Sequence, residues 1–232
     1  MAAMSVLKSD AVRAPITPPA SAPANAHAAR LAAAGSAGHP FAAELLGTHG
    51  VPSGRDLDDC VHLLASIYGR QPSPIDLALL RAPAGPVRSW LSGAADAFER
   101  ERLFLLRLSA LVGPAPSTPG HAETEAAMLA QRHALETLAQ SERQGCALGT
   151  ATALVSDWRA IRSMLDQAAR RVGCDVPPGA LPDETSIADV IGAASTSAST
   201  DRAIRFGAEQ LLLQHRAFFD LLEARADARE GF

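Results

Sequence analysis

Residues 86–112 read PVRSWLSGAADAFERERLFLLRLSALV, and this stretch decides the fold class. One set of side chains recurs at alternating steps of four and three residues: Val87, Leu91, Ala94, Phe98, Glu101, Leu105, Leu108 and Val112. This spacing places a largely apolar stripe along one side of a helix that packs against other helices. Gly113 and Pro114 end the run. The stretch therefore predicts a long helix in a helical bundle.

Proline is absent from residues 121–172, which allow one very long helix or two shorter ones. The apolar stripe of the first half and that of the second half are out of phase by about one residue, at 100° per residue. The phase changes near Gly145 and Gly149. These glycines permit a turn between two helices, or a Gly-x-x-x-Gly face inside one helix that a neighbour approaches closely.

A last helix is predicted over residues 201–229, because its stripe repeats the same spacing: Ile204, Ala208, Leu211, His215, Phe218 and Leu222. Alternating apolar and polar runs of strand length are missing from the sequence. The predicted fold is all-α, a four-helix bundle over residues 86–232. Residues 39–85 are expected to add short helices packed on the bundle, with Ser53 and Ser73 as N-caps. Residues 1–38 are Ala- and Pro-rich and are expected to be a disordered tail.

Composition excludes several classes of protein. The 232 residues are 47% apolar and 20% charged, with a formal net charge of −4, so no global positive field attracts nucleic acid. No apolar run is long enough for a membrane span or a secretory signal, so we expect a cytoplasmic protein. Three widely spaced cysteines indicate neither a zinc site nor a disulfide framework. Of 21 basic residues only Lys8 is a lysine, which suggests a GC-rich, bacterial genome.

Two polar residues, Glu101 and His215, interrupt otherwise apolar stripes. A buried carboxylate is costly without a partner. Counting residues away from the turns of antiparallel neighbours puts several acidic and imidazole side chains near one level of the bundle. They are Glu101, His133, Glu136, Asp157, Glu209 and His215.

Carboxylates and imidazoles on facing helices resemble the centre of the ferritin-like four-helix bundles, over residues 86–229 and as architecture only. The resemblance implies an iron or manganese site with Glu101, His133, Glu136 and His215 as ligands. The Glu-x-x-His motif of that superfamily is absent, and His133-x-x-Glu136 has the reverse order. The alternative interpretation needs no cofactor: Glu101 pairs with Arg132 or His215 in a purely structural contact.

Motifs for phosphate loops, nucleophile elbows and dinucleotide binding do not occur. Residues 211–222, LLLQHRAFFDLL, are apolar on more than one side, as are residues 104–106. Such helices are central in a core or shared with a second subunit. We therefore expect a non-enzymatic scaffold or interaction module, which binds an unknown protein partner or forms a homodimer. The alternative is a metal-binding protein or di-metal oxidoreductase.

Overall fold

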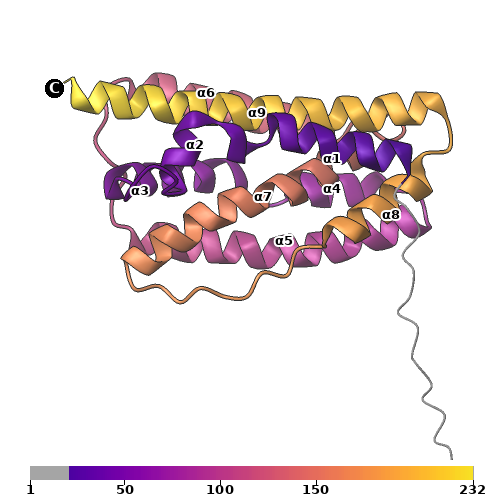
Figure 1. Ribbon diagram of the computed structural model, residues 1–232, viewed down its shortest axis with the longest axis horizontal. Coiled ribbons are helices and arrows are strands. Elements are labelled where there is room, and N and C mark those ends of the chain that lie inside the picture. Colours follow the sequence, from indigo (N-terminus) through magenta and orange to yellow (C-terminus); the bar gives the residue numbers. More distant parts are fainter. Residues whose placement is uncertain (1–20, 232) are drawn as a thin grey trace, which may run out of the picture.

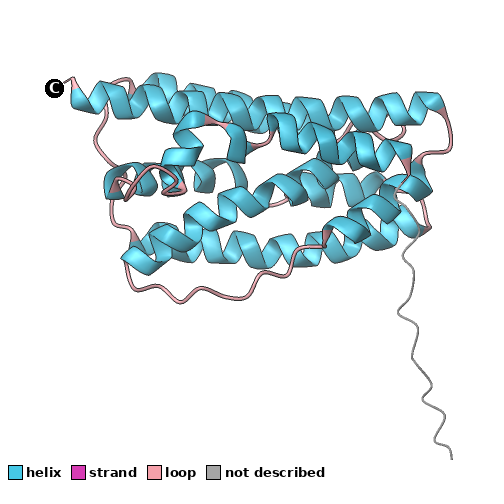
Figure 2. Cartoon of the chain, in the orientation of Figure 1, coloured by secondary structure: helices cyan, strands magenta, loops and turns pink. Residues whose placement is uncertain are grey.

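A computed structural model describes residues 21–231, in which every regular element is a helix and no strand occurs (Figures 1 and 2). The all-α prediction is confirmed for this part of the chain. The elements are α1 (Ala22–Ala34), the 3-10 helix η1 (Ser36–Gly38), α2 (Pro40–Leu45), α3 (Gly54–Tyr68), α4 (Pro74–Arg81), α5 (Pro86–Leu111), α6 (His121–Ala139), α7 (Cys146–Arg171), α8 (Glu184–Ala194) and α9 (Ala198–Glu230).

Helix α5 is the long helix predicted from residues 86–112. Its interior stripe is buried from Leu91 to Leu108, and Glu101 is buried with it. Helix α9 likewise contains the predicted final helix and begins three residues earlier, at Ala198, where the Ser197 hydroxyl accepts from the Thr200 N–H. In Figure 1, α9 and α6 run along one long edge of the molecule and α5 along the opposite edge.

Residues 121–172 form two helices, α6 and α7, with the break at residues 140–145. Gly145 takes a φ of +100° before α7, a conformation that suits glycine. Gly149 lies within α7, where it allows the neighbouring helix α9 to approach closely. A Cβ there would lie 1.9 Å from the Ile204 carbonyl oxygen of α9. One glycine therefore permits the turn, and the other permits close helix packing.

Helix α7 occupies the middle of the molecule, where it packs on α9, α5, α6 and α3. Trp158, Ile161 and Leu165 are fully buried along it. Helices α3 and α4 start at the predicted caps, Ser53 and Ser73. They contribute more than a surface layer, because their side chains belong to the same hydrophobic core as those of α7.

The expected disorder of residues 1–38 is wrong for residues 22–38, which form α1 and η1. The Ser21 hydroxyl caps α1 by accepting from the Ala24 N–H. Ala24 and His27 are buried, and α1 packs on α8 and α9. The Ala-rich sequence has too little apolar surface to order this segment by itself. Packing on α8 and α9 supplies the stabilisation that offsets the loss of conformational entropy. Residues 1–20 lie outside the described residues.

Helices in the described part of the chain are either too short or too polar to cross a membrane.

Candidate functional site

His215 lies in the core between two side chains from other helices. Its Nδ1 is 2.5 Å from Oδ2 of Asp157 on α7, and its Nε2 is 2.5 Å from the Tyr68 hydroxyl on α3. Asp157 also accepts from the Ser36 backbone N–H at 2.7 Å and from the Ser36 hydroxyl at 2.5 Å. A continuous hydrogen-bonded chain therefore joins η1, α7, α9 and α3.

The protonation states of this chain follow from its surroundings. Burial raises the pKa of Asp157, but hydrogen bonds from His215 and Ser36, and the field of His215, lower that pKa below its ordinary value. Burial and the Asp157 carboxylate raise the pKa of Tyr68 well above 10. Asp157 is therefore ionised and Tyr68 protonated at neutral pH. His215 Nδ1 donates to the carboxylate, and the Tyr68 hydroxyl lies within hydrogen-bonding distance of Nε2.

Glu101 is held by partners on α7. Its Oε1 and Oε2 lie 2.7 and 2.8 Å from Arg162 Nη1, and Oε2 accepts from the Trp158 indole N–H at 3.2 Å. The Arg162 guanidinium stacks 4.5 Å above the Phe104 ring and also pairs with Asp166 at 2.6 Å. Glu101 thus forms a structural ion pair, with Arg162 in place of the predicted Arg132 or His215.

The remaining predicted site residues do not join these clusters. His133 is exposed on α6, and Glu136 pairs along the same helix with Arg132 at 2.9 Å. Glu209 pairs with Arg30 of α1 at 2.8 Å. Of the six residues that were expected near one level of the bundle, the structure brings only Asp157 and His215 into contact. Residue counting gives the height along a helix but not the direction in which each side chain points.

Iron or manganese needs carboxylate oxygens and imidazole nitrogens with free lone pairs. Both oxygens of Glu101 and both ring nitrogens of His215 already have protein partners. Glu101, His133, Glu136 and His215 therefore do not fit the metal centre that the resemblance implies.

A second potential ligand group is His39, Asp220 and Glu223, whose ligand atoms lie within 4.8 Å of one another. The Nδ1 atom of His39 accepts the Phe41 N–H at the start of α2. The proton of a neutral His39 ring is then on Nε2, which donates to Asp220 at 2.9 Å. Metal binding at Nε2 would require loss of this helix cap, so the group is better explained as a structural contact.

A buried ionic cluster between α3 and α9 was missed from the sequence. Arg225 Nε and Nη2 each donate to Asp59 at 2.8 Å, and Arg229 donates to Asp59 and Asp56 at 2.6 Å. The sequence does contain a pattern that predicts this cluster, because the four-and-three spacing of the last helix continues from Leu222 to Arg225 and Arg229. Continuing the stripe predicts both arginines on the buried side.

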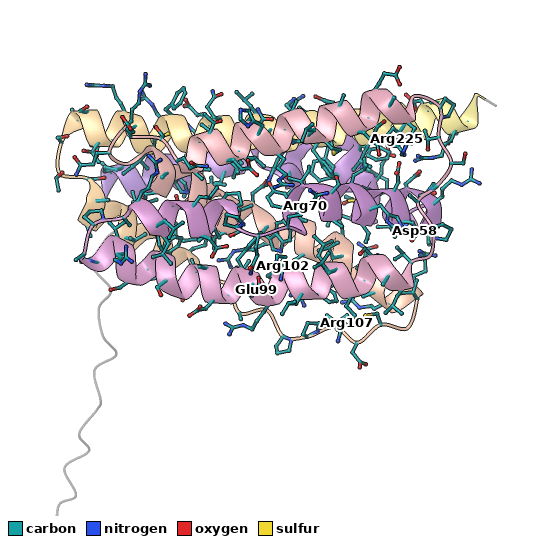
Figure 3. All side chains as sticks on the ribbon, turned by 180° about the vertical axis from the view of Figure 1, so that it is seen from behind. Asp58, Arg70, Glu99, Arg102, Arg107 and Arg225 are labelled. Carbon is teal, nitrogen blue, oxygen red and sulfur yellow. The ribbon has the colours of Figure 1, made fainter. Side chains whose placement is uncertain are left out.

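A groove of about 550 Å³ lies between α3, residues 115–118 and α6. Leu63 and Met128 are buried along it, whereas Leu129 on its edge is 69% exposed. Arg70 and Arg132 line it as well, and Arg70 is exposed. Figure 3 shows Arg70 between α6 and α5, on the side of the molecule opposite to that seen in Figure 1.

Comparison with curated proteins and with solved structures found no match. Comparison with protein families found one that covers most of the chain, residues 31–230, from α1 to the end of α9. The chain belongs to the family of unknown function DUF6975.

Proposed function

We propose that this protein is a non-enzymatic interaction module, in which α5, α6, α7 and α9 form a four-helix bundle and the α3–α6 groove binds a protein partner. The partner segment is an amphipathic helix with an apolar anchor residue and acidic residues beside it. The groove, with its exposed Leu129 and unpaired Arg70, is the observation that carries the proposal.

The apolar side of the groove suits an anchor residue. Leu63 and Met128 lie along it, and methionine adapts its shape to different partners. Leu129 leaves most of its side chain in water next to them. Covering this apolar surface would remove it from water, as in other helix-in-groove complexes.

The charges of the groove favour an acidic segment. The negative charge of Asp59 is already neutralised by Arg225 and Arg229, and the positive charge of Arg132 by Glu136. Glu125 is exposed and lies 3.4 Å from His121, which is charged only when protonated. Within the described part of the chain, the exposed Arg70 guanidinium has no ion-pair or hydrogen-bond partner. A carboxylate of the partner would supply one, and it would set the orientation of the bound segment.

The core supports a role at the surface. Glu101, Asp157 and Asp59 each use their oxygens to hold helices together. Carboxylates used in this way have a structural role. If one of them left its ion pair to take part in a reaction, its buried partner would remain unpaired.

The test replaces Leu129 with a photo-crosslinking phenylalanine analogue in the native host. The matched control has the same analogue at Leu103, which is 53% exposed on α5 and does not line the groove. The captured segment is then synthesised as a peptide, and its affinity is measured for the wild type, Leu129→Arg and Arg70→Glu.

The proposal expects capture from position 129 above that from position 103, and a peptide with an apolar anchor and acidic neighbours. Each groove variant should weaken its binding by about tenfold or more, the effect of one lost charged or apolar contact. Equal capture at both positions, or a peptide that binds the variants as tightly as the wild type, would overturn it. Capture of a second copy of this chain would overturn it in favour of a homodimer.

A further inference from the structure

A cavity of about 560 Å³ lies at the end of the molecule where α9 begins, which is on the right in Figure 1. Its lining comes from two parts of the chain: residues 143–144, in the connection between α6 and α7, and residues between 197 and 209, at the start of α9. None of these residues lines the α3–α6 groove. The cavity is therefore separate from the surface on which the proposed function rests.

Arg143, Arg202 and Arg205 line this cavity, and all three are exposed. Within residues 21–231, none of their guanidinium groups has an ion-pair or hydrogen-bond partner. The described lining includes one carboxylate, that of Glu209, and this carboxylate is already paired with Arg30 at 2.8 Å. The lining of the cavity therefore carries positive charge that no carboxylate in the lining balances.

The arrangement of the three guanidinium groups suits a doubly charged anion. Arg202 and Arg205 are three residues apart on α9, so their side chains lie on the same side of that helix. Arg143 comes from a different part of the chain, and its guanidinium carbon lies 5.6 Å from the centre of the Phe206 ring. This cation–π contact holds Arg143 beside the cavity. Guanidinium groups bind phosphate oxygens through paired N–H donors, and several together balance more than one negative charge.

A second cavity, of about 600 Å³, adjoins the first, because Arg143 and Phe206 line both. Leu138 also lines this second cavity, and Phe206 is 39% exposed. The Glu136 carboxylate in its lining is already paired with Arg132 at 2.9 Å. An apolar group attached to an anion in the first cavity would contact Phe206 and Leu138, which would remove apolar surface from water.

We propose that these two adjoining cavities bind a small, soluble organic phosphate. Its phosphate group is held by Arg143, Arg202 and Arg205, and its apolar part packs on Phe206 and Leu138. The three arginines carry the proposal, because they gather positive charge at one place in a chain whose net charge is −4. This inference goes beyond the proposed function, and it does not depend on the α3–α6 groove.

The test uses three probes: phenyl phosphate, methyl phosphate and phenylacetate. Each is titrated into ¹⁵N-labelled full-length protein at about pH 7.5, where a phosphate monoester is mostly a dianion, and the backbone amide signals are followed by NMR. Phenyl phosphate should shift the signals of residues 143–144 and 199–206 in a saturable way. Methyl phosphate should bind about tenfold more weakly, because it lacks the ring. Phenylacetate should also bind about tenfold more weakly, because it carries a single charge.

Single variants separate the cavity from general charge effects. Arg143→Gln, Arg202→Gln and Arg205→Gln change exposed side chains, so all three should fold. Each should weaken the binding of phenyl phosphate by about tenfold, the effect of one lost hydrogen bond between charged groups. The matched control is Arg100→Gln on α5, which removes the same charge from an exposed position that lines neither cavity. It should change the affinity by less than about twofold at physiological ionic strength, because salt screens distant exposed charges.

Four results would overturn the proposal. Phenyl phosphate could cause no saturable shift at residues 143–144 and 199–206. Methyl phosphate or phenylacetate could bind as tightly as phenyl phosphate, which would exclude a ligand with both a phosphate and an apolar part. Arg100→Gln could weaken binding as much as Arg202→Gln, which would mean diffuse attraction without a site. Vesicles that contain phosphatidic acid could bind the protein when phenyl phosphate does not, which would assign the arginines to a membrane surface.

Discussion

At the scale of single residues, Asp157 couples the fold to pH. Hydrogen bonds from His215 and Ser36 hold its pKa below the ordinary value despite burial. A carboxylate with a lowered pKa in the folded state stabilises the fold above its unfolded pKa of about 3.9. That stabilisation is lost as the pH falls through the folded pKa.

Asp157→Asn is predicted to lower the free energy of unfolding by about 1–3 kcal/mol at pH 7, because its amide group faces the donors Ser36 and His215. The difference from the wild type should shrink below about pH 4, where the Asp157 carboxyl of the unfolded chain takes up a proton, and it should vanish at lower pH as the folded protein takes up a proton too. Urea unfolding between pH 3 and 7, followed by tryptophan fluorescence, measures both values. If the free energies of unfolding of the wild type and Asp157→Asn differed by the same amount at every pH in this range, the lowered pKa of Asp157 would be contradicted.

Glu101 and Arg162 are predicted to act as one unit. Arg162→Met should lower the free energy of unfolding by about 3–5 kcal/mol, because it leaves the Glu101 carboxylate buried without a counter-ion. Glu101→Leu should cost less, because Arg162 keeps its ion pair with Asp166. The double variant should lose less than the sum, with a coupling of about 1–3 kcal/mol. Chemical denaturation of the four proteins measures the coupling, and additive losses would exclude a structural pair.

At the scale of helices, the α7–α9 crossing depends on two glycines. A Cβ at Gly149 would lie 1.9 Å from the Ile204 oxygen, and one at Gly207 would lie 2.1 Å from the Cys146 oxygen. Gly149→Ala and Gly207→Ala should each lower the free energy of unfolding by about 3 kcal/mol or more, because backbone atoms would have to separate.

The matched control is Gly93→Ala on the exposed side of α5, where a Cβ would meet no atom within 4 Å. That change should raise the free energy of unfolding by up to about 1 kcal/mol, since alanine favours helix more than glycine does. Thermal unfolding of the three variants compares them directly. Similar effects at all three positions would refute the close crossing.

The helices themselves were largely predictable from the sequence, because spacing, caps and breakers are local signals. Ser53, Ser73 and the stripe of α5 identify their elements without tertiary information. Helix α1 was not predictable in this way, since its Ala-rich sequence becomes ordered by packing on α8 and α9. The partner of Glu101 was also missed, because the direction of a side chain about a helix axis is decided by packing.

At the scale of the whole molecule, one hydrophobic core extends from Ala24 on α1 to Leu222 on α9. Leu64 of α3 and Ile75 of α4 belong to it, so residues 39–85 are part of the same folding unit as the long helices. Far-ultraviolet circular dichroism and tryptophan fluorescence should therefore report one coincident unfolding transition. An earlier separate transition would mean that the N-terminal helices fold independently.

Whether the buried polar groups join helices or hold metal is tested most directly by the thermal unfolding midpoint of the wild type with and without Mn(II), or with Fe(II) under anaerobic conditions. We predict no change, because Glu101 is paired with Arg162 and Trp158, His215 is paired with Asp157 and Tyr68, and neither belongs, in the described part of the chain, to a group of three or more potential ligands that lie within 4.8 Å of one another. A metal at 100 times its Kd would stabilise the fold by about 2.7 kcal/mol. A midpoint that either ion raises in the wild type, but not in Glu101→Gln or His215→Ala, would contradict a structural role for Glu101 and His215 and favour a metalloprotein.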